Sequence, residues 1–282
     1  MQIARLGPAG SEIPVVVVDG EKYDLRPLTS DIDAAFLASE FPSHIEQALR
    51  DGTLPALPDA GEWRIGAPIA RPGKIVCIGL NYRDHAEETH ADIPAEPIVF
   101  MKDPSTVVGP NDDVLIPRRS VKTDYEVELA VVIGHTARYL KDDSAAQAVI
   151  AGYAISNDVS EREFQIERGG QWDKGKSCET FNPLGPYLVP AAEIDPTALG
   201  LRLTVNGEER QNGTTANMIF PVLQVIRYLS DFMVLHPGDI VNTGTPAGVA
   251  LGRPDKPYLR RGDMIELSID GLGVQRQRMA NA

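Results

Sequence analysis

A stretch of eleven residues, DYEVELAVVIG at positions 124–134, constrains the fold of this chain more than any other. Its alternation predicts a β-strand that places Asp124, Glu126 and Glu128 on one face, with about 6.5 Å between successive carboxylates. The apolar run at 130–133 suits a core strand, so the acids lie at the mouth of a buried strand. Like charges at this spacing repel each other unless water screens them or a cation neutralises them. The pattern therefore leaves two interpretations open, a metal site and an ordinary polar face.

Composition narrows the class of protein. The chain has 282 residues, enough for one large domain or for a large domain with a small one. Its formal charge of -13 argues against nucleic acid or an anionic membrane as the main partner. No apolar stretch approaches ~18 residues and the N-terminus lacks a signal-peptide core, so we expect a cytoplasmic protein. Cys77 and Cys178 are too few for a disulfide framework, and we expect both to be reduced.

The first 70 residues predict a small N-terminal domain of α/β type. It begins with an apolar run at 13–18 and a turn at Asp19-Gly20, and two short helices follow. The second helix is predicted to begin with a capping box at Ser43 and to stop at Gly52. Four prolines between positions 55 and 72 then mark a linker. We place the main domain at residues 71–282.

Strand signals dominate the main domain. Strands are predicted at 74–79, 98–101, 125–134, 151–156, 201–205 and 264–269, with a hairpin turn at 206–207. Helices are predicted at 144–150 and 221–229. These elements indicate a β-rich α+β fold.

One candidate catalytic motif is NYRDHAEETH, residues 81–90. It follows a short apolar strand and is compatible with a helix after Tyr82, which makes His85 and Glu88 neighbours at i and i+3. A histidine oriented by a carboxylate can take a proton from water, because the carboxylate stabilises the imidazolium that forms. The alternative is an exposed helix pair worth about 0.2–0.5 kcal/mol.

A second cluster, residues 156–176, contains Asp158, Arg162, Gln165 and Lys176 near a predicted strand end. Positions 170–177 also satisfy the phosphate-loop pattern of nucleotide hydrolases. We reject that match, because the preceding residues are polar and the following ones contain prolines, where a phosphate loop needs a strand and a helix. We interpret Lys176 as a positive group for an anionic substrate, with a surface lysine as the alternative.

A third element is GDIVNTGTPAGV, residues 238–249, a strand that leads into a glycine-rich turn. Its small residues allow backbone N–H groups and the Thr245 hydroxyl to approach an anion closely. The sequence Thr-Pro-Ala-Gly at 245–248 is equally typical of an ordinary β-turn.

Taken in order, NYRDHAEE, DYEVELAVVIG, SNDVSERE, QWDKGKS, FNPLGP and TGTPAGV resemble the fumarylacetoacetate hydrolase superfamily over about residues 74–269. The resemblance implies a mixed β-sandwich roll in a homodimer. It also implies an enzyme that cleaves or rearranges carbon–carbon bonds beside 2-oxo acids with Mg²⁺ or another hard divalent ion. The chain length and the N-terminal unit resemble bacterial diketo-deoxy sugar acid hydrolases and acylpyruvases.

The resemblance also implies roles for particular residues. It gives Glu126, Glu128 and Asp158 as ligands of Mg²⁺, for which Mn²⁺ or Ca²⁺ could substitute. It makes His85 and Glu88 a catalytic dyad on a segment that can order as a lid. It also implies a catalytic lysine, a substrate-binding glutamine, a threonine that meets the substrate carboxylate and an arginine near the site: Lys176, Gln165, Thr245 and Arg162. Glu179 departs from the family's usual aspartate.

The expected activity is hydrolysis of a carbon–carbon bond in a small anionic β-diketo acid, which releases pyruvate or a related 2-oxo acid. Decarboxylation of an oxaloacetate-type substrate and isomerisation of an unsaturated 2-oxo diacid are alternatives, because they pass through a similar enolate. A catalytically silent binding protein and a phosphate-loop ATPase are the alternatives outside this chemistry.

Overall fold

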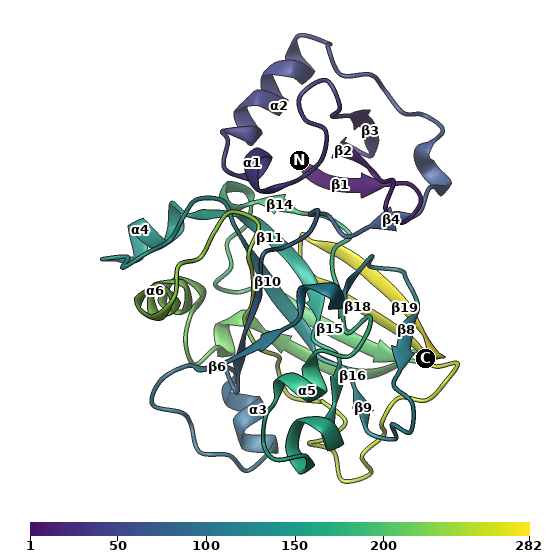
Figure 1. Ribbon diagram of the computed structural model, residues 1–282, viewed down its shortest axis with the longest axis vertical. Coiled ribbons are helices and arrows are strands. Elements are labelled where there is room, and N and C mark those ends of the chain that lie inside the picture. Colours follow the sequence, from purple (N-terminus) through teal and green to yellow (C-terminus); the bar gives the residue numbers. More distant parts are fainter.

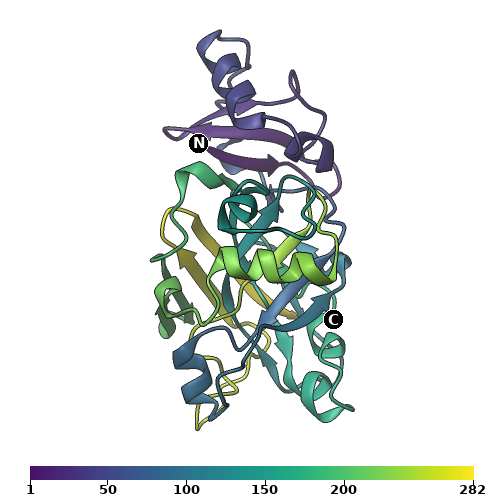
Figure 2. The same cartoon turned by 90° about the vertical axis from the view of Figure 1, so that its left-hand side faces the viewer.

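The computed structural model describes residues 1–282 and contains three main β-sheets (Figures 1 and 2). The four-stranded sheet at the N-terminus has the order β3-β2-β1-β4 and consists of β1 Gln2–Leu6, β2 Ile13–Val18, β3 Glu21–Asp24 and β4 Ile65–Gly66. The six-stranded sheet has the order β14-β11-β10-β17-β5-β6 and consists of β5 Ile75–Gly79, β6 Ile98–Lys102, β10 Val127–Ile133, β11 Ile150–Asn157, β14 Val189–Pro190 and β17 Ile240–Asn242. The five-stranded sheet has the order β16-β15-β18-β19-β8 and consists of β8 Val114–Ile116, β15 Gly200–Val205, β16 Glu208–Thr214, β18 Met264–Ile269 and β19 Gly273–Asn281.

The remaining elements are short. Two strand pairs stand apart from the main sheets: β9 Thr123–Asp124 with β12 Ser160–Glu161, and β7 Val107–Val108 with β13 Asn182–Pro183. The helices are α1 Ala34–Leu37, α2 Phe41–Arg50, α3 Arg83–Glu88, α4 Asp143–Gln147, α5 Asp173–Lys176 and α6 Val222–Phe232. A π-helical turn spans Glu163–Glu167, and 3₁₀ turns span Ala60–Glu62, Pro104–Thr106, Ala191–Glu193 and Thr215–Asn217. None of the helices combines the length and the apolar character needed to cross a bilayer.

Strand β10 lies inside the six-stranded sheet and is buried on both faces. It pairs antiparallel with β11 on one side and with β17 on the other. Leu129 and Val131 point into a core shared with the five-stranded sheet and α6. Ala130 and Val132 point into a second core on the opposite face. Because side chains alternate along a strand, the acids at 126 and 128 lie on the same face as that second core, one pleat further along.

The β-rich α+β organisation predicted from the sequence is confirmed, and all six predicted strands are present, with each end within two residues of the prediction. The hairpin at Asn206-Gly207 is also confirmed, with both residues at positive φ as a two-residue turn between β15 and β16 requires. Several strands were not predicted, among them β1, β8, β14 and β19.

The predicted helix boundaries need correction. Helix α2 begins at Phe41 with Pro42 in its first turn, and Ser43 caps nothing because its hydroxyl donates back to the Glu40 carbonyl. The end at Gly52, with φ of 64°, is as predicted. Helix α4 is capped by the Asp142 side chain and ends at Gln147, because the chain then enters β11. Helix α6 continues three residues beyond 229.

The N-terminal sheet lies across one end of the larger sheets and shares a core with them (Figure 1). Ile3 exchanges two backbone hydrogen bonds with Leu188, at 2.9 and 2.8 Å. Apolar side chains from both parts form one cluster, which includes Ile3, Val16 and Ile45 from the N-terminal part and Val132 from β10. We propose that residues 1–70 form a domain of their own, because their strands make a separate sheet. This domain packs on residues 71–282 through the shared core.

Removal of residues 1–70 should therefore destabilise the rest. The deletion would expose several apolar side chains, each worth about 1.5–3 kcal/mol when buried. For a domain of this size we expect the melting temperature to fall by roughly 10 °C or more. Calorimetry and binding of an apolar dye would measure this. If the fragment 71–282 has the same melting temperature as the full chain and binds no dye, the shared core is contradicted.

Candidate active site

Three buried carboxylates meet at the end of β10. Glu126 directly precedes this strand, Glu128 is its second residue, and Asp158 follows the adjacent strand β11. The Asp158 N–H donates to the Glu126 carbonyl at 2.9 Å, which holds the two segments in register. Each carboxylate offers an oxygen, and the three oxygens lie within 4.8 Å of one another. The predicted ligand set is thus brought together in one place.

Two lysines partly neutralise these acids. The Lys176 ammonium lies 2.7 Å from Glu126 and 2.7 Å from Asp158, and 5.0 Å from the Phe100 ring centroid. Lys102 lies 2.5 Å from the other oxygen of Asp158 and donates to the Val159 carbonyl. Sequence reasoning missed Lys102. The signal was present, because the alternation of β6 puts Lys102 on the same buried face as Phe100.

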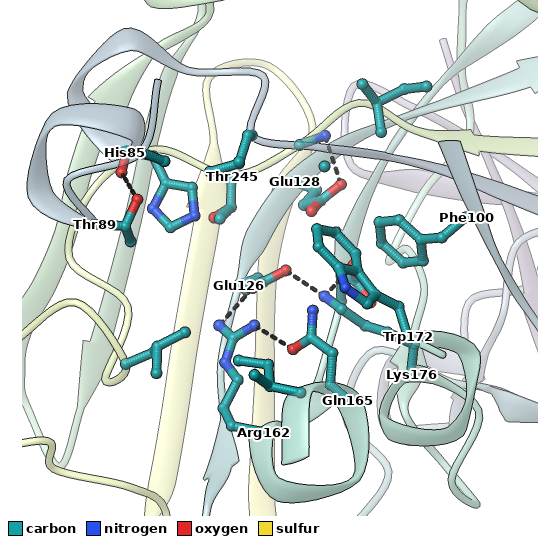
Figure 3. Close-up of a pocket in the computed structure, with 18 residues that line it drawn as sticks. His85, Thr89, Phe100, Glu126, Glu128, Arg162, Gln165, Trp172, Lys176 and Thr245 are labelled. Atoms are coloured by element: carbon teal, nitrogen blue, oxygen red, sulfur yellow. Dashed lines mark hydrogen bonds and ion pairs between the residues drawn. The ribbon is translucent and has the colours of Figure 1, made fainter. Parts of the chain in front are cut away.

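Arg162 connects the acids to the cavity wall (Figure 3). Its guanidinium donates to Asp124 at 2.8 Å, to Glu126 at 2.6 Å and to Gln165 Oε1 at 3.0 Å. Asp124 is therefore paired with an arginine, and it lies outside the three-carboxylate cluster. Burial would raise the pKa of Glu126, but Lys176 and Arg162 outweigh it and lower that pKa to about 2.

Glu128 differs from its neighbours because it has no cation partner. It accepts one hydrogen bond, at 2.8 Å from the Gly244 N–H. Burial raises the pKa of Glu128 well above its usual value, and the charges of Asp158 and Glu126 add to this effect. Three anionic oxygens with one excess negative charge fit a hard divalent cation such as Mg²⁺, which would hold Glu128 in its ionised form.

Close backbone packing places Gln165 and Lys176 side by side. Gln165 belongs to the π-helical turn and Lys176 ends α5. These two elements meet at Gly175, where a Cβ would lie 2.4 Å from the Glu161 carbonyl oxygen and 2.5 Å from the Gln165 nitrogen. Only glycine allows this approach. Because Gln165 Oε1 accepts from Arg162, its NH₂ group is the end left for a ligand.

His85 and Glu88 form the predicted pair on α3. His85 Nδ1 lies 2.7 Å from Glu88 Oε1, and the other Glu88 oxygen accepts from the Gly248 N–H at 2.9 Å. A carboxylate can only accept, so Nδ1 carries the proton and Nε2 keeps its lone pair. Gly252 packs against this carboxylate, since a Cβ there would lie 2.7 Å from Glu88 Cδ. The movement of this segment as a lid stays a prediction.

Thr245 lies in the cavity wall, but its hydroxyl already has two partners. It donates to the Val127 carbonyl at 2.9 Å and accepts from Gln211 Nε2 at 2.8 Å. Gln211 also accepts from the Val127 N–H at 3.0 Å. This buried glutamine, which sequence reasoning missed, fixes the glycine-rich turn to β10. Nothing in the local sequence around Gln211 signals that role, because its partners lie 84 and 34 residues away.

Most of the predicted site residues border one cavity of about 190 Å³. Eight of the nine predicted site residues line it: His85, Glu126, Glu128, Asp158, Arg162, Gln165, Lys176 and Thr245. The ninth, Glu88, does not line the cavity but is hydrogen-bonded to His85, which does. The volume is below the ~300–1,000 Å³ of sites for drug-sized molecules, so it suits a small ligand.

Comparison with known proteins agrees with this arrangement. Residues 74–280 match the family described as fumarylacetoacetate (FAA) hydrolase, C-terminal. A Burkholderia ambifaria protein with the name "Putative hydrolase" is 47% identical over 285 residues, which cover 100% of both chains.

Two solved structures are also similar over nearly their whole lengths. Maleylpyruvate hydrolase from Sphingobium sp. SYK-6, in complex with manganese(II) and pyruvate, is 28% identical with a TM-score of 0.82, and 100% of both chains is covered. The 5-carboxymethyl-2-hydroxymuconate delta-isomerase from Mycobacterium smegmatis is 29% identical with a TM-score of 0.79, over 100% of this chain and 99% of that one. These matches confirm the family and the type of fold inferred from the sequence. The chain belongs to the fumarylacetoacetate hydrolase family.

Proposed function

We propose that this protein hydrolyses a carbon–carbon bond in a β-diketo acid and releases pyruvate or a related 2-oxo acid. One observation carries the proposal. The His85–Glu88 pair, whose Nε2 is free to act as a base, borders the same small cavity as the three buried carboxylates. One substrate molecule in this cavity can therefore be held by the metal and attacked by a water that His85 activates.

The proposed cofactor is Mg²⁺, with Mn²⁺ or Ca²⁺ as substitutes, held by Glu126, Glu128 and Asp158. When bound, the ion would anchor the 2-oxo and carboxylate oxygens of the substrate and draw electron density from its carbonyl. The name of the Sphingobium relative, which pairs manganese with pyruvate, supports a divalent ion beside a 2-oxo acid. Glu128 supports it independently, because this buried carboxylate has no cationic side chain as a partner and its pKa is raised by burial and by Asp158 and Glu126.

The protein's own groups account for the proton transfers. His85 Nε2 takes a proton from water as the oxygen adds to the 4-carbonyl, and Glu88 stabilises the imidazolium. The C3–C4 bond then breaks, and its electron pair passes to C3 to give a pyruvate enolate and a carboxylic acid. Lys176 stabilises the enolate charge, and a proton returned to C3 completes the 2-oxo acid.

Three further residues bind or position the substrate in this proposal. The Gln165 amide donates to a substrate oxygen. Thr245 meets the substrate carboxylate at the opposite wall, which requires its hydroxyl to turn away from the Val127 carbonyl. Arg162 acts through Glu126 and Gln165, since its side-chain hydrogen bonds are to these two side chains and to Asp124. It is a positioning residue.

A second candidate is decarboxylation or isomerisation of a 2-oxo acid. The similarity to a structure named as a delta-isomerase favours it. These reactions also need an enolate to be stabilised, but neither needs an activated water. The dependence on His85 therefore distinguishes decarboxylation from hydrolysis. Isomerisation also needs a base to move a proton, and the absence of carbon–carbon cleavage distinguishes it from hydrolysis.

The metal proposal predicts a specific effect of Glu128→Gln. Glutamine keeps the shape and can still accept from the Gly244 N–H, so the variant should fold and should be at least as stable as the wild type without metal. With Mg²⁺ at 100 times its dissociation constant, linkage should stabilise the wild type by about 2.7 kcal/mol, or roughly 5 °C or more in melting temperature. Glu128→Gln should lose most of this shift.

The matched control is Glu167→Gln, an exposed acid outside the cluster, which should keep the full shift. Calorimetry with and without Mg²⁺ measures both. Equal shifts in the two variants would remove Glu128 from the metal site.

The dyad proposal predicts that His85→Ala slows hydrolysis of a diketo acid by roughly 10²- to 10⁴-fold, the usual loss for a general base. Oxaloacetate decarboxylation should fall much less. His90→Asn is the control, because His90 is exposed in the same segment and asparagine tolerates its φ of 54°. Unchanged hydrolysis in His85→Ala would show that water is activated elsewhere.

We also propose a homodimer, from the family to which the chain belongs. Light scattering should give twice the 30.6 kDa mass of one chain. A single-chain mass at working concentration would refute it.

A further inference from the structure

The cavity has a buried charged end and an exposed apolar end. The charged end holds the three carboxylates and Lys176, all at most 5% exposed. The rim is formed by apolar side chains that are partly or largely exposed: Leu80, Ile166, Trp172 and Leu251. Ile166 is 49% exposed. Apolar side chains gathered at the mouth of a cavity indicate a surface that a ligand covers.

Trp172 is held in this rim by its surroundings (Figure 3). A Cβ on Gly79 would lie 2.7 Å from the indole ring, so the ring occupies the space that a side chain would fill. Its other edge meets the Phe100 ring, with centroids 5.4 Å apart at 61°. The indole therefore forms a fixed wall. This residue belongs to the segment that mimics a phosphate loop in the sequence.

No cation is left at the rim for a second substrate carboxylate. The cationic or titratable bases that line the cavity are Arg162, Lys176 and His85. Arg162 and Lys176 are paired with Glu126 and its neighbours, and His85 with Glu88. A carboxylate that packs against the apolar rim would lose part of its water and gain no cationic partner from the residues that line the cavity, which is unfavourable.

We infer that the substrate group beyond C4 is uncharged and apolar, so that the preferred substrates are alkyl or aryl acylpyruvates. Polyhydroxylated sugar acids and diacids are disfavoured by the same rim. The identification of C4 rests on the proposed function, whereas the preference of the rim for an apolar chain can be measured without any turnover.

A matched pair of 2-oxo acids tests the rim directly. 2-Oxohexanoate and 2-oxoadipate have the same number of carbons and differ in a terminal methyl or carboxylate. With Mg²⁺ present, titration calorimetry should show 2-oxohexanoate binding about tenfold or more tightly. Equal affinity, tighter binding of 2-oxoadipate, or binding of neither acid at millimolar concentration would overturn the inference.

A variant then assigns the effect to the rim. Ile166→Arg supplies the missing cation and should narrow or reverse the preference by improving 2-oxoadipate binding about tenfold. Met264→Arg adds the same charge at an exposed apolar position on β18 that does not line the cavity, and should change nothing. If the two variants behave alike, the rim does not determine the preference.

Hydrolysis separates this inference from the proposed function. Hexanoylpyruvate, maleylpyruvate and a diketo-deoxy sugar acid should rank in kcat/KM with hexanoylpyruvate first. If maleylpyruvate or the sugar acid ranks first, the inference fails and the hydrolase proposal stands. If none is cleaved, the hydrolase proposal fails, and the binding comparison still decides the preference of the rim.

Discussion

The structure depends on how a protein keeps three carboxylates buried at the end of a core strand. Two lysines and an arginine compensate Glu126 and Asp158, which leaves Glu128 as the unpaired charge. Burying an uncompensated charge is far more unfavourable than burying a pair. The three carboxylates are therefore not fully compensated by side chains of the protein. The unpaired Glu128 carboxylate is what suits the site to a cation, which can in turn bind a chelating anion.

The same strand also explains why fold and site are inseparable. One face of β10 packs against the five-stranded sheet, and the other carries first an apolar pair and then the acids. The N-terminal sheet covers the apolar pair. What sets the position of Glu126 and Glu128 is thus the packing of a core strand on both faces, and no loop adjusts it.

Much of this arrangement could be read from local patterns. The period of two at 124–134 gave the strand and its acids, and the i, i+3 spacing gave the His85–Glu88 pair. The alternation of β6 could have shown that Lys102 is buried, but not that Asp158, 56 residues away, is its partner. Gln211 could not be found in that way, because its partner Val127 lies 84 residues away and only the folded sheets bring the two together. The start of α2 was misplaced because Ser43 fits a capping box in sequence, whereas Pro42 in the first turn already begins the helix. A local sequence pattern shows which conformations a segment can adopt, and tertiary contacts determine which one is observed.

The position of β10 between two hydrogen-bonded neighbours has a consequence for motion. Its amide hydrogens are bonded to β11 and β17 and shielded on both faces, so they should exchange with solvent only when the sheets separate. Helix α3, which carries His85, belongs to no sheet and is tied to the glycine-rich turn through the bond between the Gly248 N–H and Glu88. The sheets therefore hold the acids, whereas one short helix and its side-chain contacts hold the base. Opening of the predicted lid would move His85 and leave the three carboxylates in place.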